Sequence, residues 1–371
     1  MLRKYYMRLE LKVSSLMTKQ GESDTIRLSP KQRADLKIKL GRRLSLTANT
    51  GEKFSLVTQD SYIGDAAFGE EVAFVTQDVL DRVTGSLTNP LRVTLGCDPE
   101  FVFLDAKKNV LPANYWLPVS GVIGSDGPLA ELRPMPEEHE DGVVDNLRKL
   151  IKTLPILMDV KFGSTNLILP QGHSCWQNYA IGFHIHLGAP RELLTFAAPN
   201  TKEFMESFIT VMDYFVGIPA MLLEDSNVRR LGNGTYGKAG DYRVSSKTIE
   251  YRTPGGFHLR HPEYAAGIMG LALCLGEEVL NGWRDMSNGW RDLDKFSAFE
   301  HFREKYNLPK KREIKWALTE PTKREAVKHL PNMIRQLQRL DSFSAHKKSI
   351  CNYFNLIANN TQYSPNLLEN W

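Results

Sequence analysis

Four short segments of the sequence each carry two ionisable side chains, two residues apart. The pairs are Asp98 and Glu100, Glu131 and Arg133, His184 and His186, and Glu250 and Arg252. Apolar residues take the alternate positions, as Phe183, Ile185 and Leu187 do around the two histidines. Side chains alternate between the faces of a strand, so each pair is expected on one face, roughly 7 Å apart. The pairs contain acids, imidazoles and arginines but no lysine, which favours a polar site over four solvated faces.

The residue types in these pairs suit metal and phosphate binding. The metal-ligand candidates are Asp98, Glu100, Glu131, His184, His186 and Glu250. Hard oxygen ligands with one or two imidazoles favour Mg²⁺ or Mn²⁺ over Zn²⁺. The histidines alternatively form a hydrogen-bonded structural pair. Arg133 and Arg252 either neutralise neighbouring acids or clamp a carboxylate or phosphate through two parallel hydrogen bonds.

A glycine-rich loop carries a second set of candidate residues. Residues 232–237 match G-x-G-x-x-G, but the loop follows a predicted helix and precedes a predicted strand. A dinucleotide fingerprint needs the opposite order, so a nicotinamide site is not expected. The basic residues around the loop are Arg229, Arg230, Lys238 and Arg243. They suit phosphate oxygens, and a flexible turn with solvated bases is the alternative.

Composition and cysteine usage limit the other function classes. The 371 residues are 42% hydrophobic and 24% charged, with a net charge of +4, so neither nucleic-acid nor membrane binding is expected. The four cysteines are scattered without CxxC pairs, which favours reduced thiols in a cytosol. No apolar stretch follows the basic start as in a signal peptide. No G-x-S-x-G motif supports serine-hydrolase chemistry.

Residues 1–88 are predicted to form a small β-rich, barrel-like module for binding or attachment. Strands are expected at 6–13, 43–47, 53–57 and 72–75. A short helix is expected to begin at Pro30 with Ser29 as its N-cap. Residues 84–90 read as a linker.

Residues 89–371 are predicted to form the second domain, with a helical extension from about 285 to 371. Helical spacing is found at 137–158, 201–223 and 262–279, and a short strand is expected at 166–169. Strands mixed with long helices on one face predict an α+β antiparallel-sheet domain rather than a doubly wound one. Pro99 suggests that the strand with Asp98 and Glu100 is an edge or bulged strand.

Five segments together resemble the phage carboxylate–amine ligase type 2 family, whose domain is glutamine-synthetase-like. They are GCDPEF at 96–101, ELRP at 131–134, GFHIHLG at 182–188, YGKAGDYR at 236–243 and EYRTP at 250–254. They occur in the family's order over residues 90 to about 275. The first module and the last helices lie outside the resemblance.

The resemblance implies a curved antiparallel sheet whose concave face binds ATP and two or three divalent ions. Asp98 and Glu100 match the acid-x-acid strand, Glu131 a further metal carboxylate, and His184 the metal-binding histidine of the H-x-H strand. Glu250 and Arg252 match the E-x-R strand, in which the acid holds metal and the arginine faces phosphate. Lys238 and Arg243 match the basic loop near the phosphates. Asp at position 98 and the glycine-rich insertion before Tyr236 depart from the family pattern.

The implied activity is an ATP-dependent ligase that joins small-molecule or peptide carboxylates to amines through an acyl phosphate. Clustered acids for Mg²⁺ and arginines for phosphoryl charge agree with this chemistry. The expected location is the cytoplasm of an infected bacterium. Two alternatives are a virion or assembly protein of the same fold with little or no catalysis, and a metal-dependent hydrolase. The two substrates, the number of metals and the oligomeric state stay open.

Overall fold

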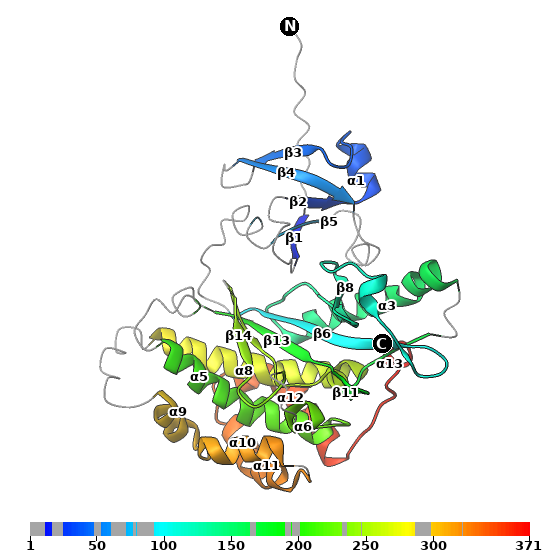
Figure 1. Cartoon of the computed structure of the whole chain (residues 1–371). Coiled ribbons are helices and arrows are strands. Elements are labelled where there is room, and N and C mark those ends of the chain that lie inside the picture. The colour runs from blue at the N-terminus through cyan, green and yellow to red at the C-terminus, as the bar shows by residue number, and fades with distance from the viewer. Residues whose placement is uncertain are drawn as a thin grey trace.

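A computed structural model of the chain describes residues 12–16, 25–47, 53–60, 72–76, 79, 93–163, 168–189, 194, 201–231, 236–245, 247–285, 298–320 and 322–371. Figure 1 shows a small N-terminal β-sheet with one helix and a larger part in which helices pack on a second sheet. The class is mixed α+β, as predicted.

Five strands of the N-terminal module form one open sheet in the order β1-β5-β2-β4-β3. Their bounds are β1 Lys12–Leu16, β2 Thr25–Leu28, β3 Arg43–Thr47, β4 Lys53–Asp60 and β5 Val72–Thr76. The three predicted strands from 43 to 75 are thus confirmed. The edge strands β1 and β3 do not pair with each other within the described residues, so the predicted barrel is not confirmed. Residues 6–11 and the predicted linker at 84–90 lie outside the described residues.

Helix α1, Pro30–Asp35, begins where the sequence predicts. The Gln32 backbone N–H donates to Ser29 Oγ at 3.1 Å, and the Ser29 N–H donates to Gln32 Oε1 at 2.8 Å. This reciprocal pair is a capping box, which satisfies two backbone donors at the start of the helix.

The larger sheet has eight antiparallel strands in the path β14-β15-β13-β6-β9-β8, and β7 and β10 also pair with β6. The bounds are β6 Leu95–Leu104, β7 Val110–Leu111, β8 Ile123–Asp126, β9 Leu129–Leu132, β10 Leu169–Gln171, β13 Phe183–Gly188, β14 Tyr242–Val244 and β15 Thr248–Tyr251. A separate hairpin joins β11 Cys175–Trp176 to β12 Tyr179–Ala180. The strand predicted at 166–169 corresponds to β10, although residues 166 and 167 lie outside the described residues.

Strand β6 is an interior strand, so the edge placement predicted from Pro99 is wrong. It pairs with β13 through Leu95–Pro99 and with β9 through Glu100 and Phe101. The Glu100 N–H donates to Gly182 O at 2.8 Å, toward the β13 side. Because successive N–H groups of a strand point to opposite sides, the nitrogen of Pro99 faces away from β13. Pairing with β9 begins only at Glu100, so the proline removes no ladder bond there.

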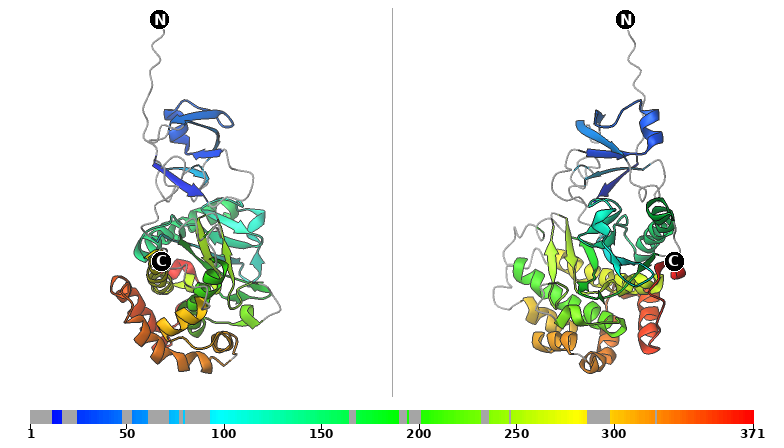
Figure 2. Two further views of the ribbon diagram at one scale, coloured as in Figure 1. Left: turned by 90° about the vertical axis from the view of Figure 1, so that its left-hand side faces the viewer. Right: turned by 45° about the vertical axis from the view of Figure 1, so that its right-hand side comes forward.

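The helices pack on the sheet face that carries the apolar alternate positions. Phe183, Ile185 and Leu187 are buried there, with α8 packed on β13 and α3 on β6. Figures 1 and 2 show α5, α8 and α12 together beneath the sheet. The bounds are α3 Glu140–Phe162, α5 Thr201–Met212, α6 Ile218–Leu223, α7 Val228–Leu231 and α8 Pro262–Asp285. The polar pairs therefore occupy the opposite face.

Two predicted helices differ from the structure in detail. Helix α3 starts three residues later than predicted, after His139, and ends at Gly163, whose φ of 67° terminates it. The predicted helix at 201–223 is continuous, but Asp213–Gly217 forms a π-helical turn within it. This segment is apolar and long enough to cross a membrane by composition, yet 83% of its most apolar window is buried inside the protein.

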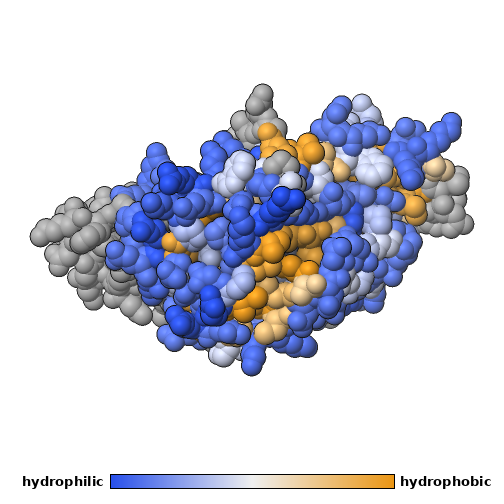
Figure 3. Space-filling view, turned by 90° about the horizontal axis from the view of Figure 1, so that it is seen from below, coloured by the Kyte–Doolittle hydropathy of each residue, from blue (hydrophilic) through white to orange (hydrophobic). Residues whose placement is uncertain are grey.

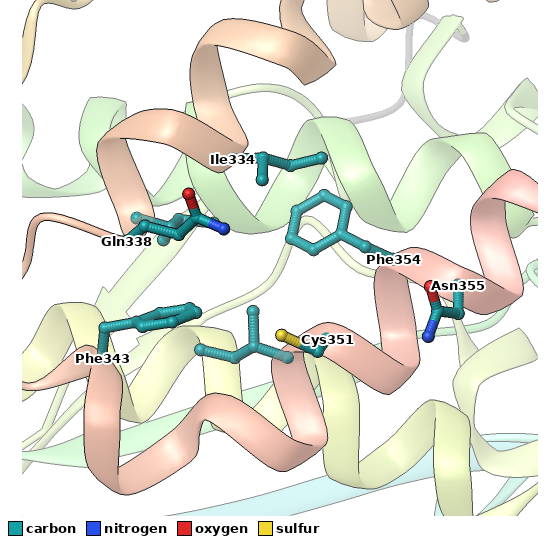
Figure 4. Close-up of a pocket in the computed structure, with 8 residues that line it drawn as sticks. Ile334, Gln338, Phe343, Cys351, Phe354 and Asn355 are labelled. Atoms are coloured by element: carbon teal, nitrogen blue, oxygen red, sulfur yellow. The ribbon is translucent and has the colours of Figure 1, made fainter.

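The C-terminal part is helical, as predicted, over residues 298–320 and 322–371. The bounds are α9 Ala298–Tyr306, α10 Lys311–Thr319, α11 Arg324–Leu337, α12 Phe343–Ala358 and α13 Leu367–Asn370. Seen from below, this side of the molecule has an apolar area surrounded by hydrophilic residues (Figure 3). Figure 4 shows a small cavity of about 180 Å³ between α11 and α12. It is lined by Ile334, Leu337, Gln338, Phe343, Ile350, Cys351, Phe354 and Asn355. Its lining carries no ionisable side chain except the Cys351 thiol.

Candidate functional site

The strand register brings the predicted polar residues of four strands side by side. On β13, His184 lies opposite Asp98 of β6, and His186 lies opposite Glu250 of β15. On the other side of β6, Glu100 lies opposite Glu131 of β9. Paired residues of neighbouring antiparallel strands project to the same face. The candidate ligands therefore form a continuous polar patch.

Three of these residues converge on one small volume. His184 Nδ1 lies 3.4 Å from Asp98 Oδ1 and 3.6 Å from Glu250 Oε1. One ligand atom from each of the three residues lies within 4.8 Å of the other two. All three residues are at most 3% exposed, and Glu250 Oε1 makes no hydrogen bond. A buried carboxylate oxygen without a hydrogen bond lacks a partner that a bound cation would supply.

Tyr236 fixes how His184 faces the two carboxylates. Its hydroxyl donates to Glu100 Oε1 at 2.6 Å and lies 2.7 Å from His184 Nε2. Since the single hydroxyl proton goes to the carboxylate, Nε2 of His184 must carry a proton and donate to the hydroxyl. Nδ1 then presents a lone pair toward Asp98 and Glu250, which is the tautomer a metal requires. The tautomer is assigned from this hydrogen-bond pattern.

His186 supports Asp98 rather than joining this group of ligand atoms. Its Nε2 lies 2.9 Å from Asp98 Oδ1, and its Nδ1 lies 3.2 Å from Thr248 Oγ1. Burial alone would raise the pKa of Asp98, but His186 opposes it most strongly, and this pKa lies well below its usual value. Burial would likewise lower the pKa of His186, but Asp98 raises it. Asp98 is therefore an anion held by an imidazolium.

Glu100 and Glu131 are more closely held by protein donors. Besides Tyr236, Glu100 accepts a hydrogen bond from the Gly182 N–H at 2.6 Å. Burial raises the pKa of Glu100. Burial also raises the pKa of Glu131 well above its usual value, although its ion-pair partner Arg133 opposes this. Arg133 also donates to Gly121 O at 2.8 Å. In this arrangement Arg133 neutralises Glu131.

Arg243, Arg252 and Lys238 lie at the rim of the patch. Arg243 Nε donates to Glu250 Oε2 at 2.5 Å, and its side chain is 63% exposed. Arg252 Nε lies 3.2 Å from Glu250 Oε1 without forming a hydrogen bond, and its guanidinium lies 4.5 Å from the centre of the Tyr236 ring. Lys238 is exposed in the turn before β14. These cations have surface available for an anionic ligand.

Arg229 and Arg230, the other two arginines near the glycine-rich loop, are buried and hydrogen-bonded to protein groups. Arg230 Nη2 donates to Glu224 Oε1 at 2.6 Å, and both side chains are 0% exposed. Arg229 Nη1 donates to Thr253 O at 2.8 Å, and its guanidinium lies 5.3 Å from the Tyr236 ring centre. The structure therefore does not bring Arg230 to the rim with Arg243. Residues 232–235 of the motif lie outside the described residues, but helix α7 precedes it and strand β14 follows it, as predicted.

Sequence reasoning missed Tyr236 and the supporting roles of Arg229 and Thr248. Tyr236 has a sequence signal, because it opens the YGKAGDYR segment that carried part of the resemblance. The roles of Arg229 and Thr248 have no comparable signal, since both depend on how loops fold onto the strands.

Several solved structures are similar to the chain at low identity. A bifunctional glutathione synthetase from Pasteurella multocida is 13% identical with a TM-score of 0.35; the match covers 72% of this chain and 52% of that one, about half its length. A GmaS/ADP complex is 11% identical with a TM-score of 0.38, covering 91% of this chain and 93% of that one. A structure described as a novel glutamine synthase homolog is 10% identical with a TM-score of 0.32, covering 88% and 81%.

The comparison with curated proteins finds no match. A family model does match, over residues 95–367, and its description is phage phiEco32-like COOH.NH2 ligase-type 2. This span contains the whole polar face of the eight-stranded sheet. The chain belongs to the phage phiEco32-like carboxylate–amine ligase type 2 family.

Proposed function

We propose that the protein is an ATP-dependent carboxylate–amine ligase whose active site is the polar face of the eight-stranded sheet. The observation that carries the proposal is the buried group formed by Asp98, His184 and Glu250, with Arg243 and Arg252 at its rim. Family membership supplies the reaction class, and this group supplies the residue types that phosphoryl transfer needs.

Asp98, His184 and Glu250 would hold a divalent ion. The fit rests on Glu250 Oε1, which is buried without a hydrogen bond, and on the lone pair that His184 Nδ1 presents. Two carboxylates and one imidazole favour Mg²⁺ or Mn²⁺. When bound, such an ion neutralises phosphate charge and orients it. Glu100, Glu131 and His186 stay candidates for further ions.

The proposed reaction has two steps with a balanced exchange of groups. A carboxylate oxygen of the first substrate attacks the γ-phosphorus of ATP, which forms an acyl phosphate and releases ADP. The nitrogen of the amine then attacks the carbonyl carbon, which forms the amide and releases inorganic phosphate. Activation is needed because an unmodified carboxylate would have to expel hydroxide or oxide, which are poor leaving groups.

The rim cations would act on the charge that develops in the first step. Arg252 is held between Glu250 and the Tyr236 ring, so its guanidinium is already oriented. An oriented donor stabilises a transition state without reorganisation at the moment of reaction. Arg243 and Lys238 would contact the other phosphate oxygens. We expect small-molecule or peptide substrates and, because ATP is consumed, a cytoplasmic location.

An isotope experiment tests the proposal. The full chain would be incubated with Mg²⁺, ATP and a panel of ¹⁸O-labelled carboxylic acids and amines, and ADP and phosphate would be analysed. The expected result is continued ADP release that requires both substrates, because the acid alone can form only one acyl phosphate per active site, with one ¹⁸O transferred to each phosphate. Glu250→Gln should abolish both signals. Amide formation without ATP, or phosphate without ¹⁸O, would overturn the mechanism.

A further inference from the structure

A second group of potential metal ligands lies in the helical layer, outside the sheet. His139 is the N-cap of α3, Glu140 is the first residue of that helix, and His346 lies in the first turns of α12. One ligand atom from each residue lies within 4.8 Å of the other two. His139 Nδ1 lies 3.3 Å and His346 Nδ1 lies 2.8 Å from the same atom, Glu140 Oε2. Two imidazoles thus converge on one carboxylate oxygen.

The hydrogen bonds of His139 fix which of its two ring nitrogens is unprotonated. The Asp141 N–H donates to His139 Nδ1 at 3.4 Å, so Nδ1 is the unprotonated nitrogen. His139 Nε2 lies 3.4 Å from Ala345 O, a carbonyl that can only accept, so Nε2 carries the proton. Nδ1 and Glu140 Oε2 are then two acceptors 3.3 Å apart, and a cation bound between them would take the Nδ1 lone pair from the long hydrogen bond of the Asp141 N–H.

Each of the three candidate ligands is also oriented by a partner on its far side. His346 Nε2 lies 3.1 Å from Glu277 Oε2 of α8, and Ser349 Oγ donates to Glu140 Oε1 at 2.6 Å. The Ala345 carbonyl has the same role for His139. Metal-bound histidines almost always donate their other nitrogen to a carboxylate or carbonyl, which fixes the ring and its tautomer.

We propose that His139, Glu140 and His346 bind a zinc-class transition-metal ion that ties α3 to α12. Two imidazole nitrogens and one carboxylate oxygen match zinc sites with three protein ligands, whereas Mg²⁺ prefers oxygen ligands. The His139 side chain is 47% exposed, which leaves room for water at a fourth position. The helix N-termini disfavour a cation, but the charges of Glu140 and Glu277 offset a divalent ion.

The competing occupant of the group is a proton. Burial alone would lower the pKa of His346, but Glu140 and Glu277 raise it to about 9, so a proton can bridge these three residues. That arrangement involves His139 only as the N-cap of α3, where its Nδ1 accepts from the Asp141 N–H. His139 therefore distinguishes a metal site from a buried ion-pair network.

Calorimetric titration of the full chain with zinc tests the proposal. Excess Mg²⁺ is present to occupy the sheet site. The test variant is His139→Asn, because asparagine keeps a capping oxygen but removes the imidazole. We expect the wild-type protein to bind one more equivalent of zinc than this variant. Glu250→Gln, which alters only the sheet site, should retain that equivalent. Glu277→Gln should weaken it about 10- to 100-fold, as losses of such supporting partners do.

A melting experiment separates a lost ligand from a damaged fold. Without zinc, His139→Asn should melt close to the wild-type protein. With zinc, only the wild-type protein should melt at a higher temperature, since a ligand stabilises the state that binds it. His139→Ser, which also keeps a capping oxygen, serves as the second variant if the Asn variant fails to fold. Equal zinc stoichiometry and affinity in the wild-type protein and a folded His139 variant would overturn the proposal.

Discussion

At the scale of single residues, the protonation of His184 connects hydrogen bonding to the proposed metal site. The Tyr236 hydroxyl donates its hydrogen bond to the Glu100 carboxylate and accepts one from His184 Nε2. The unprotonated Nδ1 of His184 then faces Asp98 and Glu250. These hydrogen bonds fix the tautomer of His184 without a bound metal. Tyr236 and Glu100 therefore set the His184 tautomer, while His186 and Arg243 contact Asp98 and Glu250.

Tyr236→Phe should weaken metal binding while largely preserving the fold. The ring still packs on Arg252, but His184 Nε2 loses its acceptor, so the tautomer is no longer fixed. Loss of such a supporting group typically costs about 10- to 100-fold in metal affinity. Calorimetric Mn²⁺ titration measures this, with Tyr242→Phe on β14 as the matched control. Unchanged affinity in Tyr236→Phe would contradict the assigned tautomer.

Arg252→Lys should impair the reaction more than stability. The Arg252 side chain is 20% exposed and near Glu250, and a partly exposed ion pair contributes at most about 1 kcal/mol. Losing one aimed donor in a transition state costs roughly 3–4 kcal/mol, which corresponds to about a hundredfold or more in rate. Lysine keeps the charge but not the planar fork.

The measurement is steady-state ADP release beside a melting curve. Arg148→Lys, at an exposed ion pair with Asp145 on α3, is the control and should change neither quantity. Normal turnover in Arg252→Lys would assign that arginine a structural role only.

At the scale of helices and strands, the sequence predicts faces but not registers. Alternation of apolar residues was enough to place His184 and His186 together, and Asp98 with Glu100, on polar faces. Which strand neighbours which depends on pairing between segments more than 80 residues apart, such as His184 with Asp98. The resemblance, not the periodicity, gave the expectation of one shared site.

The sequence does not predict how individual charged residues and prolines are placed in the fold. Arg230 and Arg243 look equivalent in the sequence, yet one is buried against Glu224 and the other is exposed at the rim. Pro99 predicts an edge strand because proline cannot donate a ladder hydrogen bond. In the structure, β9 pairs with β6 only from Glu100 onward, one residue after the proline. In both cases the outcome depends on the partner that the fold supplies.

The Glu224–Arg230 pair predicts a loss of stability in acid. Glu224 caps the end of α6 and accepts from Arg230, Ser174 and Gly255. Burial alone would raise its pKa, but Arg230 and the other donors lower it from 4.5 to about 2. A depressed folded-state pKa contributes stability above pH 4.5 that disappears as the pH falls toward 2. This difference between the unfolded-state and folded-state pKa of Glu224 corresponds to about 3 kcal/mol of folding stability.

Urea unfolding of the wild-type protein and Glu224→Gln at several pH values checks this expectation. The free energy of unfolding should differ most above pH 5, and the difference should shrink by about 3 kcal/mol toward pH 2. Glu325→Gln, which removes an exposed partner of Lys328, is the matched control and should show little change with pH. A pH-independent difference for Glu224→Gln would mean that the pair is held by packing rather than charge.

At the scale of the whole molecule, the described residues form a small N-terminal hydrophobic core, a large core, and a third small cluster that includes Val102 and Leu104 of β6. The N-terminal core contains Ile26, Leu28, Phe54 and Leu56, and the larger core lies almost wholly after residue 92. Phe74 and the partly buried Val72 of β5 pack with the larger core, and Arg27 Nη1 donates to Ser120 O at 2.8 Å. The proposed active site draws every residue from the larger part.

A fragment that starts at residue 89 should therefore fold and keep its metal site. It retains the larger core except Phe74 and Val72, and it loses the hydrogen bond from Arg27 to Ser120 O. A hydrogen bond from a charged donor contributes about 1.5–3 kcal/mol, and the freed carbonyl becomes accessible to water. We expect a cooperative melt at a somewhat lower temperature, followed by circular dichroism, and Mn²⁺ affinity equal to that of the full chain by calorimetry. Phe74→Ala in the full chain tests the contribution of this ring, which packs in the larger core and lies 5.6 Å from the Arg27 guanidinium. If the fragment aggregates or melts without cooperativity, the N-terminal module is part of the catalytic fold. If the fragment folds but binds Mn²⁺ more weakly than the full chain, the module supports the polar face of the sheet.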